Sequence, residues 1–176
     1  MNTDINPQNT AIRRKHGSAP AKHNLDLFCK GDVLDFGCGH GADVEYYKSM
    51  GIDAVGYDPH HYDINPDAYF ENVTITYVLN TINIVQRQEC IADAIQYLKT
   101  GGRLIITVRA DVERNARTKG WPKHLDGYWS NQRRGMFQAD IPVHQIKWLV
   151  GKYMYAKLVE IKKTSGFRTL VFEKLY

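Results

Sequence analysis

Apolar and polar positions along the chain follow two different periods. Four short apolar runs are typical of buried strands: 32–36, 54–57, 73–79 and 103–109. Four segments carry apolar residues at helical spacing: 21–29, 42–50, 86–98 and 142–153. Two alternating runs, 154–162 and 168–175, flank a turn at Ser165-Gly166. Strands separated by helices and followed by a hairpin predict a doubly wound, Rossmann-like α/β sheet with an antiparallel C-terminal edge.

The stretch richest in candidate chemistry follows the first of these strands. The run 33–36 breaks into a turn that contains Gly37, Gly39 and Gly41, and a helix begins directly after it. The next apolar run stops at Asp58, 19 residues after Gly39. Glycines let the backbone approach a ligand where a Cβ would clash, and an acid at the second strand's end can accept both ribose hydroxyls. This βαβ pattern predicts a site for a nucleoside-containing cofactor.

The spacing of the glycines distinguishes between such cofactors. A dinucleotide turn reads G-x-G-x-x-G, whereas this chain has G-x-G-x-G preceded by Asp35. The carboxylate of Asp35 would repel a pyrophosphate, whereas it suits a cofactor that carries a positively charged amino-acid group. The pattern resembles the first motif of class I methyltransferases that use S-adenosylmethionine. That resemblance implies S-adenosylmethionine as cofactor, with the following cofactor-binding residues: Asp35, Phe36, Gly37, Cys38, Gly39, His40, Gly41, Asp58, Pro59 and Asn80.

The segment after Asp58 departs from that fold's usual pattern. Residues 59–72 include two prolines and no run of four apolar residues, so we expect the third strand to be reduced or missing. The end of that strand normally recognises the adenine. Asp63, Asn65 and Asp67 are substitutes by position.

Composition indicates an ordinary globular protein. The 176 residues are 43% hydrophobic and 24% charged, and no apolar segment approaches the roughly 18 residues of a membrane span. Three cysteines without paired spacing disfavour a disulfide framework and a zinc site. We expect a cytoplasmic, metal-free protein, with residues 1–20 as a flexible basic segment and 21–176 as one methyltransferase-like domain.

Charge is distributed unevenly. Residues 31–108 carry eleven acids and four bases, whereas the first thirty residues carry a net +3, residues 109–134 a net +4 and residues 147–176 a net +5. The acidic block coincides with the cofactor half, and the basic segments lie where this class of enzyme usually builds its substrate face. A basic substrate face suggests an anionic partner, with nucleic acid foremost.

Candidate acceptor-binding residues combine positive charge with aromatic rings, a combination that suits phosphate contacts beside stacked bases. They are Arg13, Arg14, Arg109, Trp121, Tyr128, Trp129, Arg133 and Arg134. Asn80, at a strand end, is a candidate catalytic residue beside the methyl group, and His124 is the candidate general base. Each has a simpler interpretation: Asn80 as a turn residue, His124 as an incidental loop residue, and the tryptophans as a cover for the core. Cys38 fits a small packed residue better than a nucleophile.

The chain also resembles the methyltransferases associated with DNA phosphorothioation gene clusters, from about Thr10 to Val150. The segments that carry this resemblance are 10–14, 18–20, 34–44, 56–59, 77–82 and 134–138. His40 stands where that family usually has arginine. The resemblance implies DNA modification, but Asn80 lacks the following prolines that amino-directed DNA methyltransferases use, and no Pro-Cys pair of the cytosine-C5 enzymes is present.

Three functions therefore stay open at this point. The first is a nucleic-acid methyltransferase, with DNA favoured over RNA as the acceptor. The second is a small-molecule methyltransferase whose basic face binds an anionic metabolite. The third is a non-catalytic module that binds S-adenosylmethionine.

Overall fold

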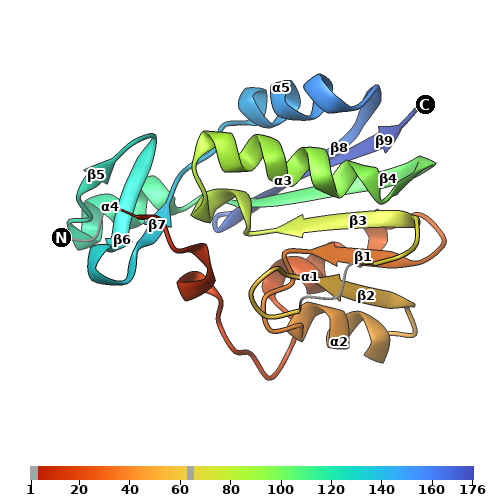
Figure 1. Ribbon diagram of the computed structural model, residues 1–176, viewed down its shortest axis with the longest axis horizontal. Helices are drawn as coiled ribbons and strands as arrows, with labels where there is room; N and C mark the ends of the chain where they lie inside the picture. Colours follow the sequence, from red (N-terminus) through yellow and green to blue (C-terminus); the bar gives the residue numbers. More distant parts are fainter. Residues whose placement is uncertain (1–3, 63–65) are drawn as a thin grey trace.

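A six-stranded sheet forms the centre of the molecule in the computed structural model, which describes residues 4–62 and 66–176 (Figure 1). Its strand order is β2-β1-β3-β4-β9-β8, with β1 to β4 parallel and β9 and β8 antiparallel. The strands are β1 (Val33–Phe36), β2 (Ala54–Tyr57), β3 (Phe70–Thr76), β4 (Leu98–Arg109), β8 (Ala156–Lys163) and β9 (Phe167–Lys174). This arrangement confirms the predicted α/β fold with an antiparallel C-terminal edge.

Helices cover both faces of this sheet (Figure 1). One face lies under α3 (Ile84–Gln96) and α5 (Val143–Tyr153), and the other lies against α1 (Ala19–His23) and α2 (Ala42–Ser49). The short 3-10 helices are η1 (Pro7–Thr10), η2 (Leu25–Leu27), η3 (Leu79–Thr81) and η4 (Gln132–Arg134). The main core forms between the sheet and the α3–α5 layer. No helix in the described part of the chain is both long and apolar enough to cross a membrane.

Several element bounds differ from the sequence prediction: the helix expected at 21–29 is divided into α1 and η2, and β4 begins at Leu98 rather than at 103. Two further differences have evident local reasons. Strand β3 ends at Thr76 rather than at 79, because Tyr77 adopts a positive φ of 61° that no strand accommodates. Helix α3 begins two residues earlier than predicted, since Asn83 and Gln86 form a reciprocal capping box.

Among the described residues, no third strand of the usual fold is present, in line with the prediction that it is reduced or missing. Strand β2 is the last strand on its side of the sheet, and residues 58–62 and 66–69 form only an isolated bridge between Asp58 and Tyr62. Asp63 and Asn65, proposed as substitutes for adenine recognition, lie outside the described residues. Asp67 is exposed.

The segment between β4 and α5, which showed no clear period in the sequence, is in fact regular. It forms α4 (Val112–Lys119) and a small second sheet of β5 (Lys123–His124), β6 (Gly127–Asn131) and β7 (Met136–Gln138). These strands are too short to leave a periodic signal, and a register shift between Trp129 and Asn131 interrupts the pairing of β6 with β7. We call this small sheet the cap, because it lies beside the carboxyl end of the main sheet (Figure 1).

Candidate cofactor and active site

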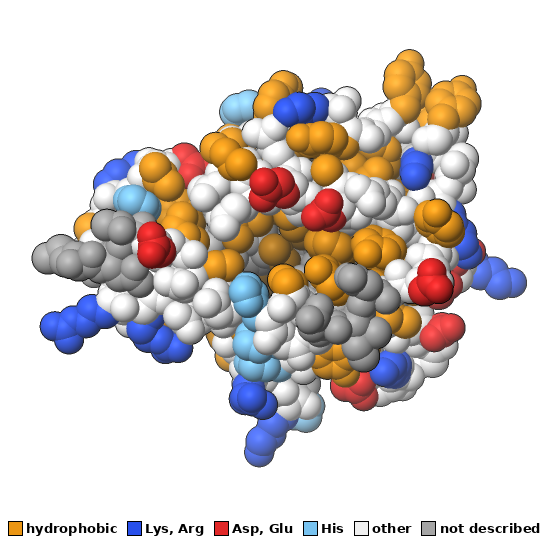
Figure 2. All heavy atoms as spheres, in the orientation of Figure 1, with side chains coloured by type: hydrophobic (Ala, Val, Ile, Leu, Met, Phe, Trp, Pro, Cys, Tyr) orange, Lys and Arg blue, Asp and Glu red, His pale blue; other side chains and the backbone are white. Residues whose placement is uncertain are grey.

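A cavity of about 370 Å³ opens at the carboxyl ends of β1, β2 and β3, where open α/β sheets bind ligands. The glycine turn, the end of β2, Tyr77 after β3, and one side of α3 line it, and residues 7–12 lie along its edge. Figure 2 shows the hollow at the centre of this face, with hydrophobic side chains inside it and histidines on its lower rim. The N-terminal segment, which the sequence predicts to be flexible, is placed here as one wall of the cavity.

The glycine turn has the geometry that its sequence implies. Gly37 has φ 85°, its amide donates to the Tyr57 carbonyl at 2.7 Å, and a Cβ would lie 2.4 Å from a Val78 methyl carbon. Only glycine therefore fits at this position. Cys38 packs against Gly56, and burial raises the pKa of its thiol, so the side chain stays a neutral packed group.

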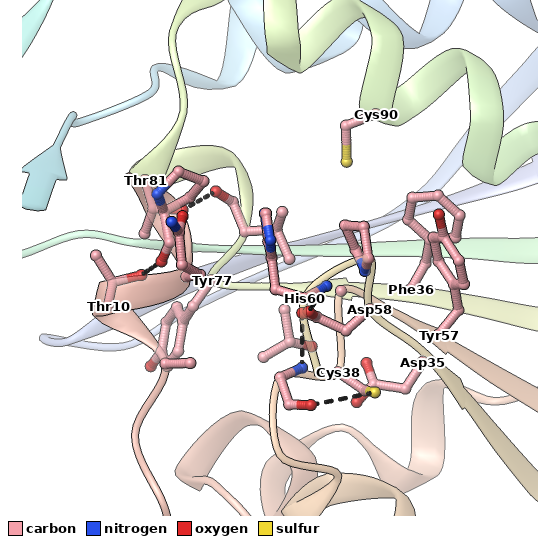
Figure 3. Close-up of a pocket in the computed structure, with 18 of the residues that line it drawn as sticks. Thr10, Asp35, Phe36, Cys38, Tyr57, Asp58, His60, Tyr77, Thr81 and Cys90 are labelled. Atoms are coloured by element: carbon pink, nitrogen blue, oxygen red, sulfur yellow. Dashed lines mark hydrogen bonds between the residues drawn. The ribbon is translucent and has the colours of Figure 1, made fainter. Parts of the chain in front are cut away.

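Asp35 supplies a negative charge at the base of this turn (Figure 3). Its side chain is 2% exposed and accepts a hydrogen bond from Thr74 Oγ1 at 2.8 Å. Burial, with the neighbouring Asp43 and Asp58 carboxylates, raises the pKa of Asp35 to about 7. A carboxyl whose ionised form is so disfavoured gains most from a cationic partner. The site therefore fits the ammonium group of S-adenosylmethionine.

Asp58, at the end of β2, is held in place by backbone amides. Gly39 donates to Oδ2 at 3.0 Å, and His60 and His61 donate to Oδ1 at 2.9 and 3.1 Å. Because an ionised carboxylate oxygen accepts two hydrogen bonds, Oδ2 retains room for a ribose hydroxyl. Pro59 and His60 also line the cavity, and the ring of His40 packs at a tilt against that of His61, with ring centroids 4.2 Å apart.

The two expected catalytic residues do not line this cavity. Asn80 is wholly buried: its Nδ2 donates to the Ala139 carbonyl at 2.7 Å, and its Oδ1 accepts from the Arg109 amide at 2.8 Å. Both polar atoms are engaged in joining β4, η3 and the residue that follows β7, so this position gives no support to the catalytic and cofactor-binding interpretation, which stays a prediction. His124 lies in the cap and stacks on Trp129 at 4.3 Å. Its role as a general base finds no support in this position.

The expected acceptor-binding residues divide into two groups. Arg14 lines the cavity, and Arg13 is exposed next to it. Trp129 is 4% exposed and packs edge-on against Phe137, so it covers the core, and this position gives no support to its predicted role in stacking on a base. The others lie in the cap or at its edge, away from the cavity lining: Trp121, Tyr128, Arg133, Arg134 and Arg109, whose guanidinium pairs with Asp111 at 2.8 and 2.9 Å.

Tyr77 is the main site residue that the sequence did not reveal. It lines the cavity directly after β3, and a bulky side chain at positive φ is strained, which is a feature of functional sites. Burial raises the pKa of its phenol to about 12. The β-branched run 73–79 indicated a longer strand instead, and no residue type in it signals a left-handed turn. Among the described residues, no group of three or more His, Cys, Asp and Glu side chains is arranged to hold a metal ion.

Comparison with known families decides the class of this site. A family model described as "Methyltransferase domain" matches residues 11–153, which include the glycine turn, Asp58 and Tyr77. The chain belongs to this methyltransferase family. Its cavity offers a glycine cradle, a buried acid for an ammonium group and an acid for a ribose, and these fit S-adenosylmethionine. The predicted enzyme class, an S-adenosylmethionine-dependent methyltransferase, is thereby confirmed.

Solved structures share the fold of this methyltransferase. TehB from Haemophilus influenzae has a TM-score of 0.61 and 15% identity over 92% of this chain, which spans 63% of TehB. The glycopeptide N-methyltransferase MtfA, complexed with S-adenosyl-L-homocysteine, has a TM-score of 0.64 and 10% identity over 94% of each chain. A 1,6-didemethyltoxoflavin-N1-methyltransferase from Burkholderia thailandensis, with 1,6-didemethyltoxoflavin and S-adenosylhomocysteine bound, has a TM-score of 0.63 and 14% identity. The match covers 98% of this chain and 80% of that enzyme. A comparison with curated proteins finds no match.

Proposed function

We propose that this methyltransferase transfers a methyl group to a small anionic acceptor that enters the cavity beside Tyr77 and Arg14. S-adenosylmethionine supplies the activated methyl on its sulfonium. The chain's residues bind and orient the reactants: Asp35 neutralises the ammonium of the amino-acid tail, and Asp58 holds the ribose. Such positioning accounts for much of the rate gain in a bimolecular displacement.

The observation that carries the choice of an anionic acceptor is a second, basic hollow of about 620 Å³ next to the cofactor cavity. The two hollows share Arg14, His40 and Ala42 in their linings, so they adjoin each other. Lys15, His16 and Lys22 also line the second hollow, together with Glu45, whose carboxylate pairs with Lys48. In the described part of the chain, no carboxylate forms an ion pair with Arg14, Lys15 or Lys22. The positive charges of these three side chains are therefore available to an anion.

Enclosure favours a small acceptor over a polymer. Residues 7–12 lie along the cofactor cavity, and two hydrogen bonds tie this segment to the cap: Asn6 N to the Gly135 carbonyl at 2.9 Å, and Asn9 Nδ2 to the Arg134 carbonyl at 2.8 Å. The ring expected to stack on bases, Trp129, is buried. These contacts would restrict the approach of a polymer to the methyl group of the bound cofactor.

Nucleic acid is the second candidate acceptor. The exposed Arg13 and Arg14 of the N-terminal segment and the exposed Arg133 and Arg134 of η4 support it, as does the resemblance to methyltransferases associated with DNA phosphorothioation. Under either proposal a cytoplasmic location stays a prediction.

The test is transfer of labelled methyl from S-adenosylmethionine to DNA, to RNA and to a fractionated pool of anionic metabolites. We expect label in the small-molecule fraction, with Arg14→Ala lowering kcat/KM at least tenfold while cofactor affinity is unchanged. Arg114→Ala, which removes an exposed arginine from α4, is the matched control. Label in DNA or RNA, with affinity that falls steeply as salt rises, would establish the second candidate instead. Transfer that is insensitive to Arg14 would refute the entry route.

A further inference from the structure

The cofactor cavity extends beyond Asp58 along one side of α3. From the turn at Pro59 and His60 it continues between Tyr57 and α3. Four residues of α3 line this extension, and their spacing places them on one face of the helix: Gln86, Glu89, Cys90 and Asp93. In Figure 3, Cys90 points from α3 into the open space across from Tyr57, Phe36 and Asp58. We call this region the α3 pocket.

The walls of the α3 pocket suit a flat aromatic base. Phe36 and Tyr57 form an apolar side, with ring centroids 5.0 Å apart, and Ile82 lines the cavity close to the start of α3. Burial raises the pKa of the Cys90 thiol to about 12, so this side chain presents a neutral, polarisable surface. A base attached to a ribose at Asp58 reaches this space directly.

We propose that α3 takes over adenine recognition in this chain, with Glu89 accepting a hydrogen bond from the 6-amino group of the adenine. The inference rests on the proposed use of S-adenosylmethionine and deepens it by naming how the base is recognised. It replaces the expected assignment to the segment after β2, which contains Asp63, Asn65 and Asp67.

Two properties favour Glu89 as the hydrogen-bond acceptor for the 6-amino group: its position on α3 and the availability of its carboxylate. The Gln86 Oε1 already accepts the Asn83 amide in the capping box at 3.1 Å. Glu89 is exposed at the rim of the pocket, and in the described part of the chain no group forms a hydrogen bond or ion pair with its carboxylate. Asp93 lies four residues further along α3, about 6 Å farther from the carboxyl edge of the sheet where the ribose is held.

A double-mutant cycle tests this assignment. Calorimetry measures the affinity of wild type and Glu89→Ala for S-adenosylhomocysteine and for its analogue whose base is purine, without the 6-amino group. We expect wild type to bind the purine analogue about tenfold more weakly, because the hydrogen bond to a carboxylate is lost. Glu89→Ala should bind both ligands equally. Glu160→Ala, which removes an exposed glutamate of β8 outside the cavity lining, is the matched control and should keep the wild-type preference. Asp93→Asn tests the other acid of the same helix face.

Each outcome decides the assignment. Glu89 is exposed, so Glu89→Ala is expected to fold, and its circular dichroism spectrum checks this. If Glu89→Ala keeps the wild-type preference for the 6-amino ligand, or if only Asp93→Asn loses it, the assignment to Glu89 is wrong while the cofactor proposal stands. If wild type binds neither ligand, both the assignment and the proposed cofactor fail.

Discussion

At the scale of single residues, Asp58 is the clearest test of the ribose site. Replacing it with alanine removes the acceptor for the ribose and for three backbone amides, so we expect affinity for S-adenosylhomocysteine to fall about tenfold to a hundredfold. Calorimetry measures this loss. Asp53→Ala is the matched control, because Asp53 is exposed just before the start of the same strand, and its affinity should be unchanged. Unchanged affinity in Asp58→Ala would contradict the ribose assignment.

Asp35 predicts opposite effects of pH on stability and on binding. In the folded protein its pKa is raised from 3.8 to about 7, so the unfolded chain releases this proton first as pH rises. The folded state therefore loses stability between pH 3.8 and about 7, and above that range the buried charge is fully present. Asp35→Asn should raise the thermal midpoint of the free protein by a few degrees at pH 8, and the gain should disappear near pH 4.

The same carboxyl makes cofactor binding stronger at higher pH, because the ammonium group pairs with the ionised form. Wild type should bind S-adenosylhomocysteine more tightly at pH 8 than at pH 6 and release a proton at pH 6, which calorimetry in buffers of different ionisation enthalpy detects. Asp35→Asn should bind S-adenosylhomocysteine more weakly than wild type at pH 8, and it should release no proton on binding at pH 6. For the stability prediction, an Asp35→Asn variant whose thermal midpoint at pH 8 equals that of wild type would contradict the assignment of a buried charge to Asp35.

At the scale of elements, Asn80 joins η3, β4 and the cap. Its replacement by alanine leaves the Ala139 carbonyl and the Arg109 amide without their partner in a buried place, so we expect a loss of about 2–3 kcal/mol in the free energy of unfolding. Denaturant titration measures it. Asn115→Ala on α4, whose amide bonds the partly exposed Asp111, should cost less than about 1 kcal/mol. A stable Asn80→Ala variant that has lost methyl transfer would support the catalytic interpretation.

At the scale of elements, the sequence patterns predicted those features that depend on local spacing along the chain. The glycine turn, Asp58 and the strands at 33–36 and 54–57 follow from short-range geometry, and the structure has them where the pattern indicated. The cap strands span only two to five residues, which is too short for a periodic signal. The positive φ at Tyr77 has no compositional mark.

At the scale of the whole molecule, the charge and aromatic content of the sequence indicated a substrate face, but they did not indicate how its side chains are arranged. Arg109 pairs with Asp111, two residues further along the chain, and Trp129 enters the core, where it packs against Phe137 of the neighbouring cap strand. Neither pairing leaves a mark in the charge or the aromatic content of the sequence. Arg14 alone of the eight expected acceptor-binding residues lines the cofactor cavity. The sequence predicted a reduced or missing third strand, but the α3 face that lines the cofactor cavity emerged only from the packing of distant segments.

The account depends on S-adenosylmethionine binding at the glycine turn, and calorimetry of S-adenosylhomocysteine with wild type and Gly37→Ala tests this most directly. The account predicts one ligand per chain for wild type. Gly37→Ala should abolish binding, since its Cβ would meet Val78 at 2.4 Å in a backbone with φ 85°. Gly101→Ala, also at positive φ but in open space far from the cavity, should bind normally. No binding by wild type, or undiminished binding by a folded Gly37→Ala variant, would contradict the account.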